Sequence, residues 1–125
     1  MFTKLYLNGI IVIEVEECME YFAENRKLTK ILNDPRLLVK NFGRDRAKRI
    51  QARLDEFDAA DTLKQIPSDP PPRCHRLHNN LEGKFAVDVS KNFRIVFEGY
   101  DKADQLSVEK SAIVTIQIIN IEDYH

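Results

Sequence analysis

The sequence predicts a compact α+β domain in which helices pack on one face of a small antiparallel sheet. Two observations lead to this prediction. Apolar residues recur at helical spacing through residues 28–57, and after a proline-rich connector they alternate or run continuously, as in strands. The 125 residues fit one domain, and a hydrophobic content of 43% is sufficient for a single core.

The first eighteen residues predict a β-hairpin, because apolar stretches flank Asn8 and Gly9, which tolerate the positive φ angles of a tight turn. A second interpretation concerns the start of translation. Two consecutive glutamates stand shortly before Met19, and their codons can form a ribosome-binding sequence upstream of a start codon. We therefore expect translation to begin naturally at Met19, with residues 1–18 an extension of a single domain whose core spans about 19–125. Removing them changes the net charge from −1 to +1.

The helical region follows a short extended segment around Tyr21 and Phe22. Pro35, preceded by two candidate N-cap residues, interrupts the first helical repeat. We expect a kinked helix or two abutting helices, ended by Gly43. A second helix is predicted from about residue 44 to 60. Its predicted buried face consists of Ala47, Ile50, Leu54 and Phe57.

The second half of the chain predicts strands. Residues 67–73, with four prolines, exclude a helix or a central strand, and we expect an extended polyproline-like connector there. Alternation then predicts an antiparallel hairpin around a turn at residues 90–92, and residues 112–121 are apolar on both faces, which indicates a central strand. The inward residues of the hairpin are Phe85, Val87, Val89, Phe93, Ile95 and Phe97.

Composition excludes several classes of protein. Cys18 and Cys74 lack CxxC spacing and are expected to be reduced thiols of a cytosolic protein. No apolar run reaches the length of a membrane span, and the N-terminus lacks the basic region of a secretory signal. A net charge of −1 argues against a protein that coats nucleic acid, although a local patch can still bind a phosphate backbone.

Polar chemistry gathers before and within the predicted hairpin. The segment 73–84 contains two histidines and several cations, which are either solvated loop residues or ligands. A zinc site needs four nitrogen or sulfur donors, and Cys74 is badly placed to complete one, so no metal is predicted. Arg94 falls on the opposite strand face from Phe93 and Ile95.

These residue types suit RNA cleavage without a metal or cofactor. RNA carries its own nucleophile, the 2′-hydroxyl, so the protein must supply a base, an acid and a cation to offset charge on the phosphorane. Histidine suits proton transfer near neutral pH, and arginine suits the phosphate through its bidentate fork. His75, Arg94, Tyr124 and His125 supply such a set if the strand ends converge.

About four fifths of the chain resembles a known family. The stretches are KLTKILNDPRLLVKNFGRDRAKRIQARLDEFDAADTL, PPPRCHRLHNNLEGKFAVDVSKNFRIVFE and IQIINIEDYH, and the last is the most specific. They are similar to the HigB-like branch of the RelE/ParE superfamily of type II toxin–antitoxin toxins, which includes "killer" proteins of plasmid maintenance. The resemblance implies a RelE-like fold, with two N-terminal helices packed on a small twisted antiparallel sheet.

The resemblance also implies a function and partners. It implies a ribosome-dependent mRNA endonuclease, or mRNA interferase, of the bacterial cytoplasm that inhibits translation. Such a toxin is held inactive by a HigA-like helix-turn-helix antitoxin that also represses the operon. Its partners would be this antitoxin, the ribosome and mRNA, with operator DNA contacted only through the antitoxin and no membrane involved.

By position, the resemblance assigns roles to individual residues. His75 and His125 would transfer protons, Arg94 would stabilise the scissile phosphate, Tyr124 would contact the substrate, and Asp123 would orient a neighbouring base. The expected catalytic set is therefore His75, Arg94, Asp123, Tyr124 and His125. The expected RNA-binding set is Arg73, Arg76, His78, Lys84 and Lys91.

One turn departs from the family pattern. Where relatives have LKGDRKG, this chain reads LHNNLEG, so that His78 replaces a lysine, Asn79 a glycine, and Leu81 and Glu82 basic residues. Each lost cation removes a potential phosphate contact. Two alternatives therefore stay open: a catalytically weakened toxin homologue that binds its antitoxin, and a ParE-like toxin that binds gyrase.

A basic stripe on the second predicted helix has three interpretations. It could meet ribosomal RNA or an acidic antitoxin segment, or simply be a solvated helix face. The stripe consists of Arg46, Lys48, Arg49 and Arg53.

Overall fold

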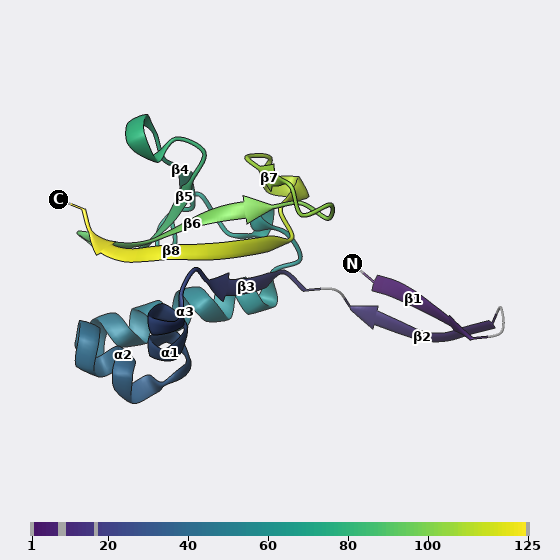
Figure 1. Cartoon of the computed structure of the whole chain (residues 1–125), viewed down its shortest axis with the longest axis horizontal. Coiled ribbons are helices and arrows are strands. Elements are labelled where there is room, and N and C mark those ends of the chain that lie inside the picture. The colour runs from purple at the N-terminus through teal and green to yellow at the C-terminus, as the bar shows by residue number, and fades with distance from the viewer. Residues whose placement is uncertain (1, 8–9, 17, 125) are drawn as a thin grey trace.

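Three helices cover one face of a six-stranded sheet in the computed structural model of this chain, which describes residues 2–7, 10–16 and 18–124 (Figure 1). The strands follow the order β3-β8-β6-β5-β4, and β7 pairs with the end of β6. Their bounds are β3 Glu20–Ala23, β4 His75–Arg76, β5 Phe85–Ser90, β6 Phe93–Tyr100, β7 Leu106–Ser107 and β8 Thr115–Asp123. The predicted α+β class is confirmed.

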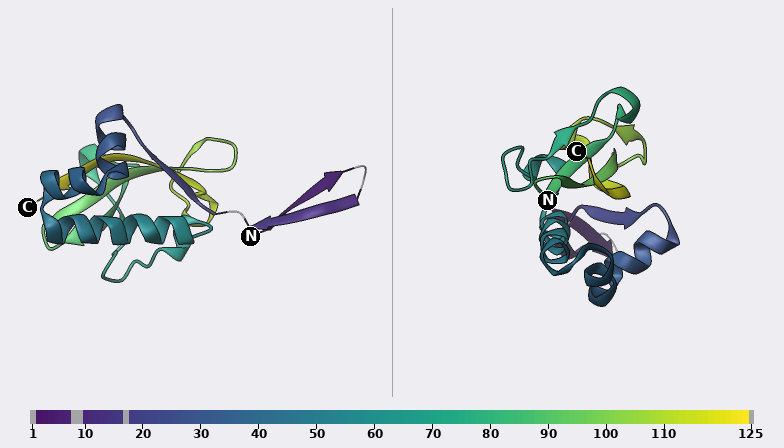
Figure 2. Two further views of the ribbon diagram at one scale, coloured as in Figure 1. Left: turned by 90° about the horizontal axis from the view of Figure 1, so that it is seen from below. Right: turned by 90° about the vertical axis from the view of Figure 1, so that its left-hand side faces the viewer.

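The predicted N-terminal hairpin is present as β1 (Phe2–Leu7) paired antiparallel with β2 (Ile10–Glu16). Its turn, residues 8–9, lies outside the described residues. Figure 1 and the left view of Figure 2 show this ribbon apart from the sheet and the helices. Met19, which is buried, donates its backbone N–H to the carbonyl of Ala60 at 2.7 Å. A translation start at Met19 stays a prediction.

The helical region divides at Pro35 into α1 (Arg26–Asn33) and α2 (Pro35–Phe42), followed by α3 (Arg44–Ala59). Pro35 is at the first position of α2, and the carboxylate of Asp34 caps that helix by accepting from the N–H of Arg36 at 2.9 Å. Of the two interpretations, abutting helices are therefore correct, and the number of helices is three rather than two. Gly43, at φ +84°, ends α2 as predicted.

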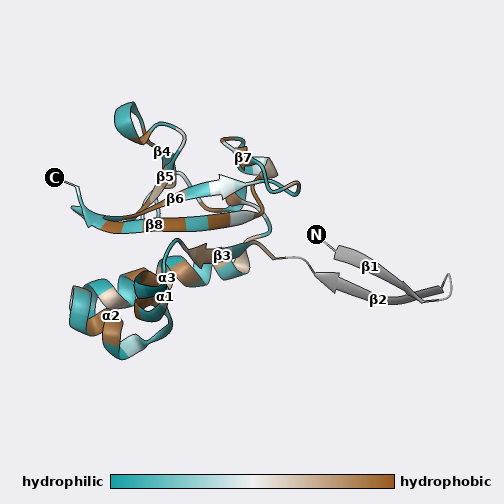
Figure 3. Ribbon diagram, in the orientation of Figure 1, coloured by the Kyte–Doolittle hydropathy of each residue, from teal (hydrophilic) through white to brown (hydrophobic). Residues whose placement is uncertain are grey.

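The core lies between α3 and the sheet. Phe57 of α3 contacts Phe97 of β6 edge to face, with ring centroids 5.5 Å apart, and Phe85 of β5 stacks on Phe97 at 5.8 Å. Figure 3 shows hydrophobic stretches along α3 and β8, and both elements contribute residues to this cluster. The inward sides predicted for the second helix and for the hairpin are confirmed, because all of these residues belong to or pack against this one cluster.

The central position predicted for β8 is confirmed, since it pairs with β6 on one side and β3 on the other. The expectation of a wholly antiparallel sheet is wrong at one edge, where β3 runs parallel to β8 and Tyr21 pairs with Ile116. A two-residue alternation reads the same in either direction. The parallel pair is reached through a long connection, since residues 24–114, with the three helices and strands β4 to β7, lie between β3 and β8.

The proline-rich connector is not extended. A polyproline helix has no internal hydrogen bonds, whereas here Arg73 donates its N–H to the carbonyl of Asp69 at 3.0 Å and Cys74 donates to that of Pro67 at 2.9 Å. The segment also contacts the sheet, because Asp88 donates its N–H to the carbonyl of Pro72 at 2.7 Å. The polyproline-like prediction is therefore wrong, and the exclusion of helix and strand is right.

Gly99 of β6 provides a test of core packing. A Cβ atom added at this position would collide with the side chain of Ile113, which is fully buried. We expect Gly99→Ala to lower the free energy of unfolding by about 1–3 kcal/mol because a packed core resists overpacking. Chemical denaturation of the wild type and of Gly99→Ala at the same pH measures this difference in the free energy of unfolding.

The double variant Gly99→Ala/Ile113→Ala is the control. Removing the Ile113 side chain vacates the space that the new methyl group needs, so the two effects should be strongly non-additive. Additive losses would show that the collision with Ile113 does not cause the destabilisation.

The two cysteines should differ in reactivity. Both are free, with Cys18 exposed and Cys74 buried. Burial raises the pKa of the Cys74 thiol from 9.0 to about 11, although the nearby Lys110 ammonium lowers it. Since the thiolate is the reactive form, iodoacetamide at pH 8 should add to Cys18 alone in native protein and to both cysteines in denaturant, as read by intact mass. Equal labelling of both in native protein would contradict the buried position of Cys74.

Candidate active site

Three charged side chains form a row across adjacent strands, on the sheet face turned away from the helices. Asp88 of β5 pairs in register with Arg94 of β6, which pairs with Glu122 of β8. The guanidinium of Arg94 donates from Nε and Nη2 to Glu122 Oε2 at 3.2 and 2.9 Å. We call Asp88, Arg94 and Glu122 the charged row. The predicted orientation of Arg94 is confirmed.

The end of the chain is anchored beside this row. Tyr124 donates its backbone N–H to the carbonyl of Asn92 at 2.9 Å and its hydroxyl to the carbonyl of Lys91 at 3.2 Å. The guanidinium carbon of Arg94 lies 4.5 Å from the centre of the Tyr124 ring, in cation–π contact. The tail is thus fixed through Tyr124. His125 lies outside the described residues, so its predicted role stays a prediction.

Arg73 approaches the row from the connector. Its Nε and Nη2 donate to the two carboxylate oxygens of Asp88 at 2.7 and 3.1 Å, and Nη2 also contacts the Tyr124 hydroxyl at 3.5 Å. The hydrogen bond to Asp88 raises the pKa of the Arg73 guanidinium, so it is always charged. Its backbone has φ +44°, a left-handed conformation that few residues other than glycine adopt.

The same residue fixes the ring of His75. The carbonyl of Arg73 is 2.6 Å from His75 Nδ1. A carbonyl oxygen only accepts hydrogen bonds, so Nδ1 must carry the proton, and in the neutral ring Nε2 is left as the acceptor. His75 therefore presents the nitrogen that a general base requires.

Strand register limits the distance between His75 and Arg94. His75 pairs with Ala86, two residues along β5 from the partner of Arg94. With about 3.3 Å per residue and about 4.8 Å between strands, their Cα atoms are roughly 12 Å apart. His75 and Arg94 are therefore two strand spacings apart on the same face of the sheet.

Asp123 is not brought to the charged row. It pairs in register with Phe93, whose ring packs on the helix side of the sheet, so alternation directs Asp123 away from Arg94. The structure thus gathers four predicted site residues (Arg73, His75, Arg94 and Tyr124) and leaves Asp123 on the other face.

The unusual LHNNLEG turn folds over the sheet as a 3-10 turn at Asn79–Leu81. Asn79 adopts φ +60°, which asparagine tolerates better than most residues and which explains how it replaces a glycine. Leu81 packs over Leu77 on the outer face. Glu82 lies 3.4 Å from the guanidinium of Arg76 and 3.5 Å from the His78 ring, so this carboxylate, at a position where the resembling family has a basic residue, also occupies Arg76.

Sequence reasoning missed the carboxylates that pair with the predicted cations. Besides Asp88, Glu122 and Glu82, Glu98 lies 3.5 Å from Lys84, whereas Lys91 is exposed at the hairpin turn. One partner was foreseeable, because the predicted turn at 90–92 would set Asp88 opposite Arg94. The structure reaches the same pair differently, with Ser90 paired to Phe93 and a bulge between Asp88 and Ser90. Glu122 was not, because β8 pairs with β6 over a long separation and through a register shift.

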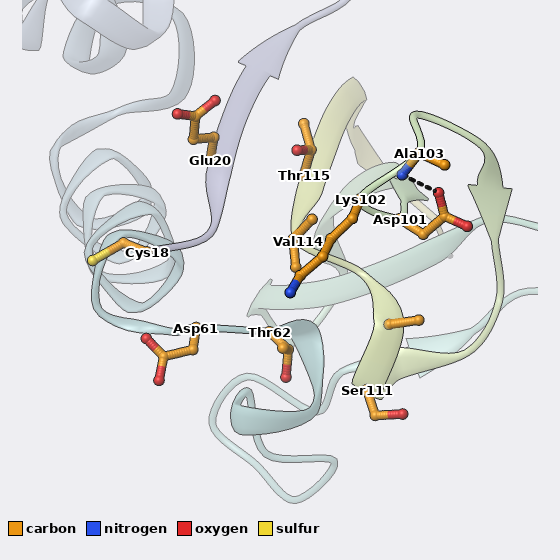
Figure 4. A pocket seen from close by; sticks show the side chains of 11 residues that line it. Cys18, Glu20, Asp61, Thr62, Asp101, Lys102, Ala103, Ser111, Val114 and Thr115 are labelled. Carbon is orange, nitrogen blue, oxygen red and sulfur yellow. Dashed lines mark hydrogen bonds between the residues drawn. The ribbon is translucent and has the colours of Figure 1, made fainter. Parts of the chain in front are cut away.

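A cavity also lies away from the charged row. A cavity of about 860 Å³ opens at the beginning of β3 and β8, beside Cys18, Asp61 and Thr115 (Figure 4). Thr115 is seven residues from Glu122 along β8, about 23 Å. Asp101 at its rim accepts from the N–H of Ala103 at 2.9 Å and so closes its own turn. Chemistry at the charged row therefore does not use this cavity.

The described residues contain neither a metal-ligand cluster nor a membrane-spanning helix. They contain no group of three or more histidine, cysteine, aspartate or glutamate side chains arranged to hold a metal. No helix within them has the length and hydropathy needed to cross a bilayer.

Comparison with known proteins identifies the fold. No family model and no curated protein matches the sequence. Among solved structures, the fold is shared with a toxin. That protein is the YoeB/ParE toxin from Agrobacterium tumefaciens, which superimposes with a TM-score of 0.53 over 86% of this chain and 100% of its own, at 8% sequence identity. This likeness supports the resemblance to RelE/ParE-type toxins at the level of fold.

The pairing of Arg94 with Glu122 generates a prediction about anion binding. Replacing the carboxylate by Glu122→Gln frees the guanidinium, which is only 13% exposed, for an external anion. An ion pair of this kind is worth up to about 1 kcal/mol, so inorganic phosphate should bind about two- to fivefold tighter. NMR titration of the Arg94 Nε–H signal measures this affinity.

Glu109→Gln is the matched control, because Glu109 is exposed in a loop and accepts from Ser111 at 3.0 Å. It should leave the titration unchanged. If Glu122→Gln behaves like this control, Glu122 does not compete with anions for Arg94.

Proposed function

We propose that this chain is the toxin of a type II toxin–antitoxin system and cleaves mRNA on the ribosome. One observation carries the proposal: Arg94 is held between the Tyr124 ring and Glu122, while Arg73 and His75 lie on the adjoining edge. A base, two guanidinium groups and an aromatic ring thus share one sheet face. The toxin fold of the Agrobacterium protein supports the same reading.

The proposed reaction needs only side chains and the RNA. His75 Nε2 takes the proton of the 2′-hydroxyl, whose oxygen attacks the adjacent phosphorus. The bond from phosphorus to the 5′-oxygen breaks, and His125 donates a proton to that oxygen. The products are a 2′,3′-cyclic phosphate and a free 5′-hydroxyl. Arg94 and Arg73 offset the charge on the phosphorane.

Tyr124 has two proposed contributions. Its ring holds Arg94 in place, and the same aromatic ring is proposed to contact a nucleotide base. Asp123, on the opposite face, is proposed to act only by positioning the tail that carries His125. The RNA contacts predicted for Arg76, His78, Lys84 and Lys91 flank this centre.

The proposed biological setting follows the resemblance to HigB-like toxins. In the bacterial cytoplasm, a HigA-like helix-turn-helix antitoxin would inhibit the toxin, and the complex would contact operator DNA through the antitoxin. Growth arrest would follow release of the toxin from this complex.

A second candidate is a catalytically weakened homologue that retains antitoxin binding. It is favoured by the carboxylates on the sheet face, because Arg73, Arg76, Lys84 and Arg94 each lie within 3.5 Å of one. A phosphate must displace these partners before it can be bound. A ParE-like toxin that binds gyrase is the third reading, in which growth arrest would be independent of His75 and Arg94.

Induction in a bacterial host tests the proposal. Wild type should stop growth and produce new mRNA 5′ ends in a repeated pattern. Arg94→Ala and His75→Ala should each reduce cleavage at least about 100-fold, because each removes a group that acts in the transition state. Arg94→Lys keeps the charge but loses the bidentate fork, so its cleavage rate should lie between those of the wild type and Arg94→Ala.

Lys64→Ala is the control, since Lys64 is exposed and lies outside the sheet face. It should cleave like wild type. Growth arrest without new 5′ ends, undiminished by Arg94→Ala, would favour the gyrase-binding reading. Absence of arrest despite soluble, folded protein would favour the weakened homologue.

A further inference from the structure

The helical layer concentrates positive charge. Residues 26–49 contain nine lysines and arginines but only two acidic residues, Asp34 and Asp45, a balance of +7 in a chain whose total is −1. All nine cations are exposed. They are Arg26, Lys27, Lys30, Arg36, Lys40, Arg44, Arg46, Lys48 and Arg49.

These cations are almost unpaired, unlike those of the sheet face. Within residues 18–124, the ion pair that involves one of them joins Arg36 to Asp34 at 3.9 Å, with the Arg36 side chain 95% exposed. Arg46 stacks over the Phe93 ring at 4.2 Å. Arg53 does not belong to this surface, contrary to the predicted stripe, because it is buried and contacts Glu56 at 3.0 Å. The remaining cations of the layer are available to an external anion.

The arrangement costs the helices stability. Three like-charge pairs are spaced four residues apart, and each is destabilising by about 0.2–0.5 kcal/mol. The pairs are Arg26 with Lys30, Arg36 with Lys40, and Arg44 with Lys48. Arg26 and Lys27 also occupy the first turn of α1, where no acidic residue offsets the positive end of the helix dipole. Folding alone does not favour such a distribution, whereas binding to a polyanion does.

The surface suits a phosphate backbone better than a protein. Protein partners bind through buried apolar anchors, yet Val39 is the large apolar side chain that is exposed on these helices in the described structure. Nonspecific nucleic-acid affinity needs dense cations and no anchors. Figure 3 shows the helices on the side of the sheet opposite to the β4–β5 loop, so a ligand on the helices leaves the charged row accessible.

We propose that residues 26–49 bind the phosphate backbone of structured RNA, as a second surface distinct from the charged row. This proposal goes beyond mRNA cleavage, because it concerns affinity and is independent of any catalytic activity. It assigns anchoring to the unpaired cations of the helices and chemistry to the paired cations of the sheet.

The test measures the salt dependence of RNA binding. Fluorescence anisotropy follows a labelled RNA hairpin from 50 to 300 mM salt, with every protein carrying Arg94→Ala so that cleavage cannot interfere. Lys40→Gln/Lys48→Gln should flatten the plot of log K against log salt by about 1.4–1.8, because each phosphate contact contributes about 0.7–0.9. Affinity at 100 mM salt should fall at least tenfold.

Lys64→Gln/Lys102→Gln is the matched control, since it removes two exposed lysines outside the helices. This control should change neither the RNA affinity nor the slope of log K against log salt by much. The midpoint temperature of unfolding of Lys40→Gln/Lys48→Gln, the helix variant, should be unchanged or slightly higher than that of the wild type. The reason is that the substitutions remove the repulsion in the pairs Arg36–Lys40 and Arg44–Lys48. This result separates lost binding from lost folding.

Three outcomes would overturn the proposal. They are wild-type binding by the helix variant, an equal loss in the lysine control, and tighter binding of a DNA duplex of the same length at the same salt. In the first of these outcomes, loss of antitoxin binding by the same variant would assign the surface to an acidic protein segment. Because cleavage is not measured, failure of the proposed nuclease activity leaves this test unaffected.

Discussion

The register of the central strand β8 determines the rest of the structure. Its ladder with β6 places Glu122 opposite Arg94 and brings the N–H of Tyr124 to the carbonyl of Asn92. A shift of one residue would exchange the two faces of the strand. Ile121 would then leave the core, and Glu122 would enter it. Burial of isoleucine in β8 thus fixes the electrostatics of the candidate site, and the same ladder keeps the terminal segment from fraying.

A bulge in this ladder explains where sequence reasoning stopped. Helix positions, both inward faces and the central place of β8 followed from periodicity, because each depends on local spacing. The place of Glu122 in the charged row did not follow from periodicity, because Ile119 is an extra residue between the pairs Val96–Asn120 and Phe97–Ile118. The bulge reverses the alternation, which lets both Ile118 and Ile121 face the core and turns Glu122 toward Arg94. A long-range register shift leaves no local signal, and neither does the direction of β3.

The net charge of −1 conceals two opposite environments. The helical segment 26–49 carries +7, so the remainder of the chain carries −8. On the sheet, carboxylates lie 2.7 Å from Arg73 and 2.9 Å from Arg94, so the local net charge is close to zero. Under the proposed RNA binding, the net charge of the whole chain is therefore a poor guide to nucleic-acid affinity. The relevant quantity is the number of cations without a carboxylate within ion-pair distance.

Separating the two surfaces has a physical consequence for a nuclease. At the charged row, RNA must open the pairs of Arg73 with Asp88 and Arg94 with Glu122, so binding there is intrinsically weak. An RNA already anchored on the helices makes that second contact intramolecular, and its effective concentration replaces the affinity that the row lacks. An mRNA fragment too short to span both surfaces would bind the charged row poorly. Under the two proposals together, dependence on a large structured RNA such as the ribosome then follows from the charge distribution of the toxin itself.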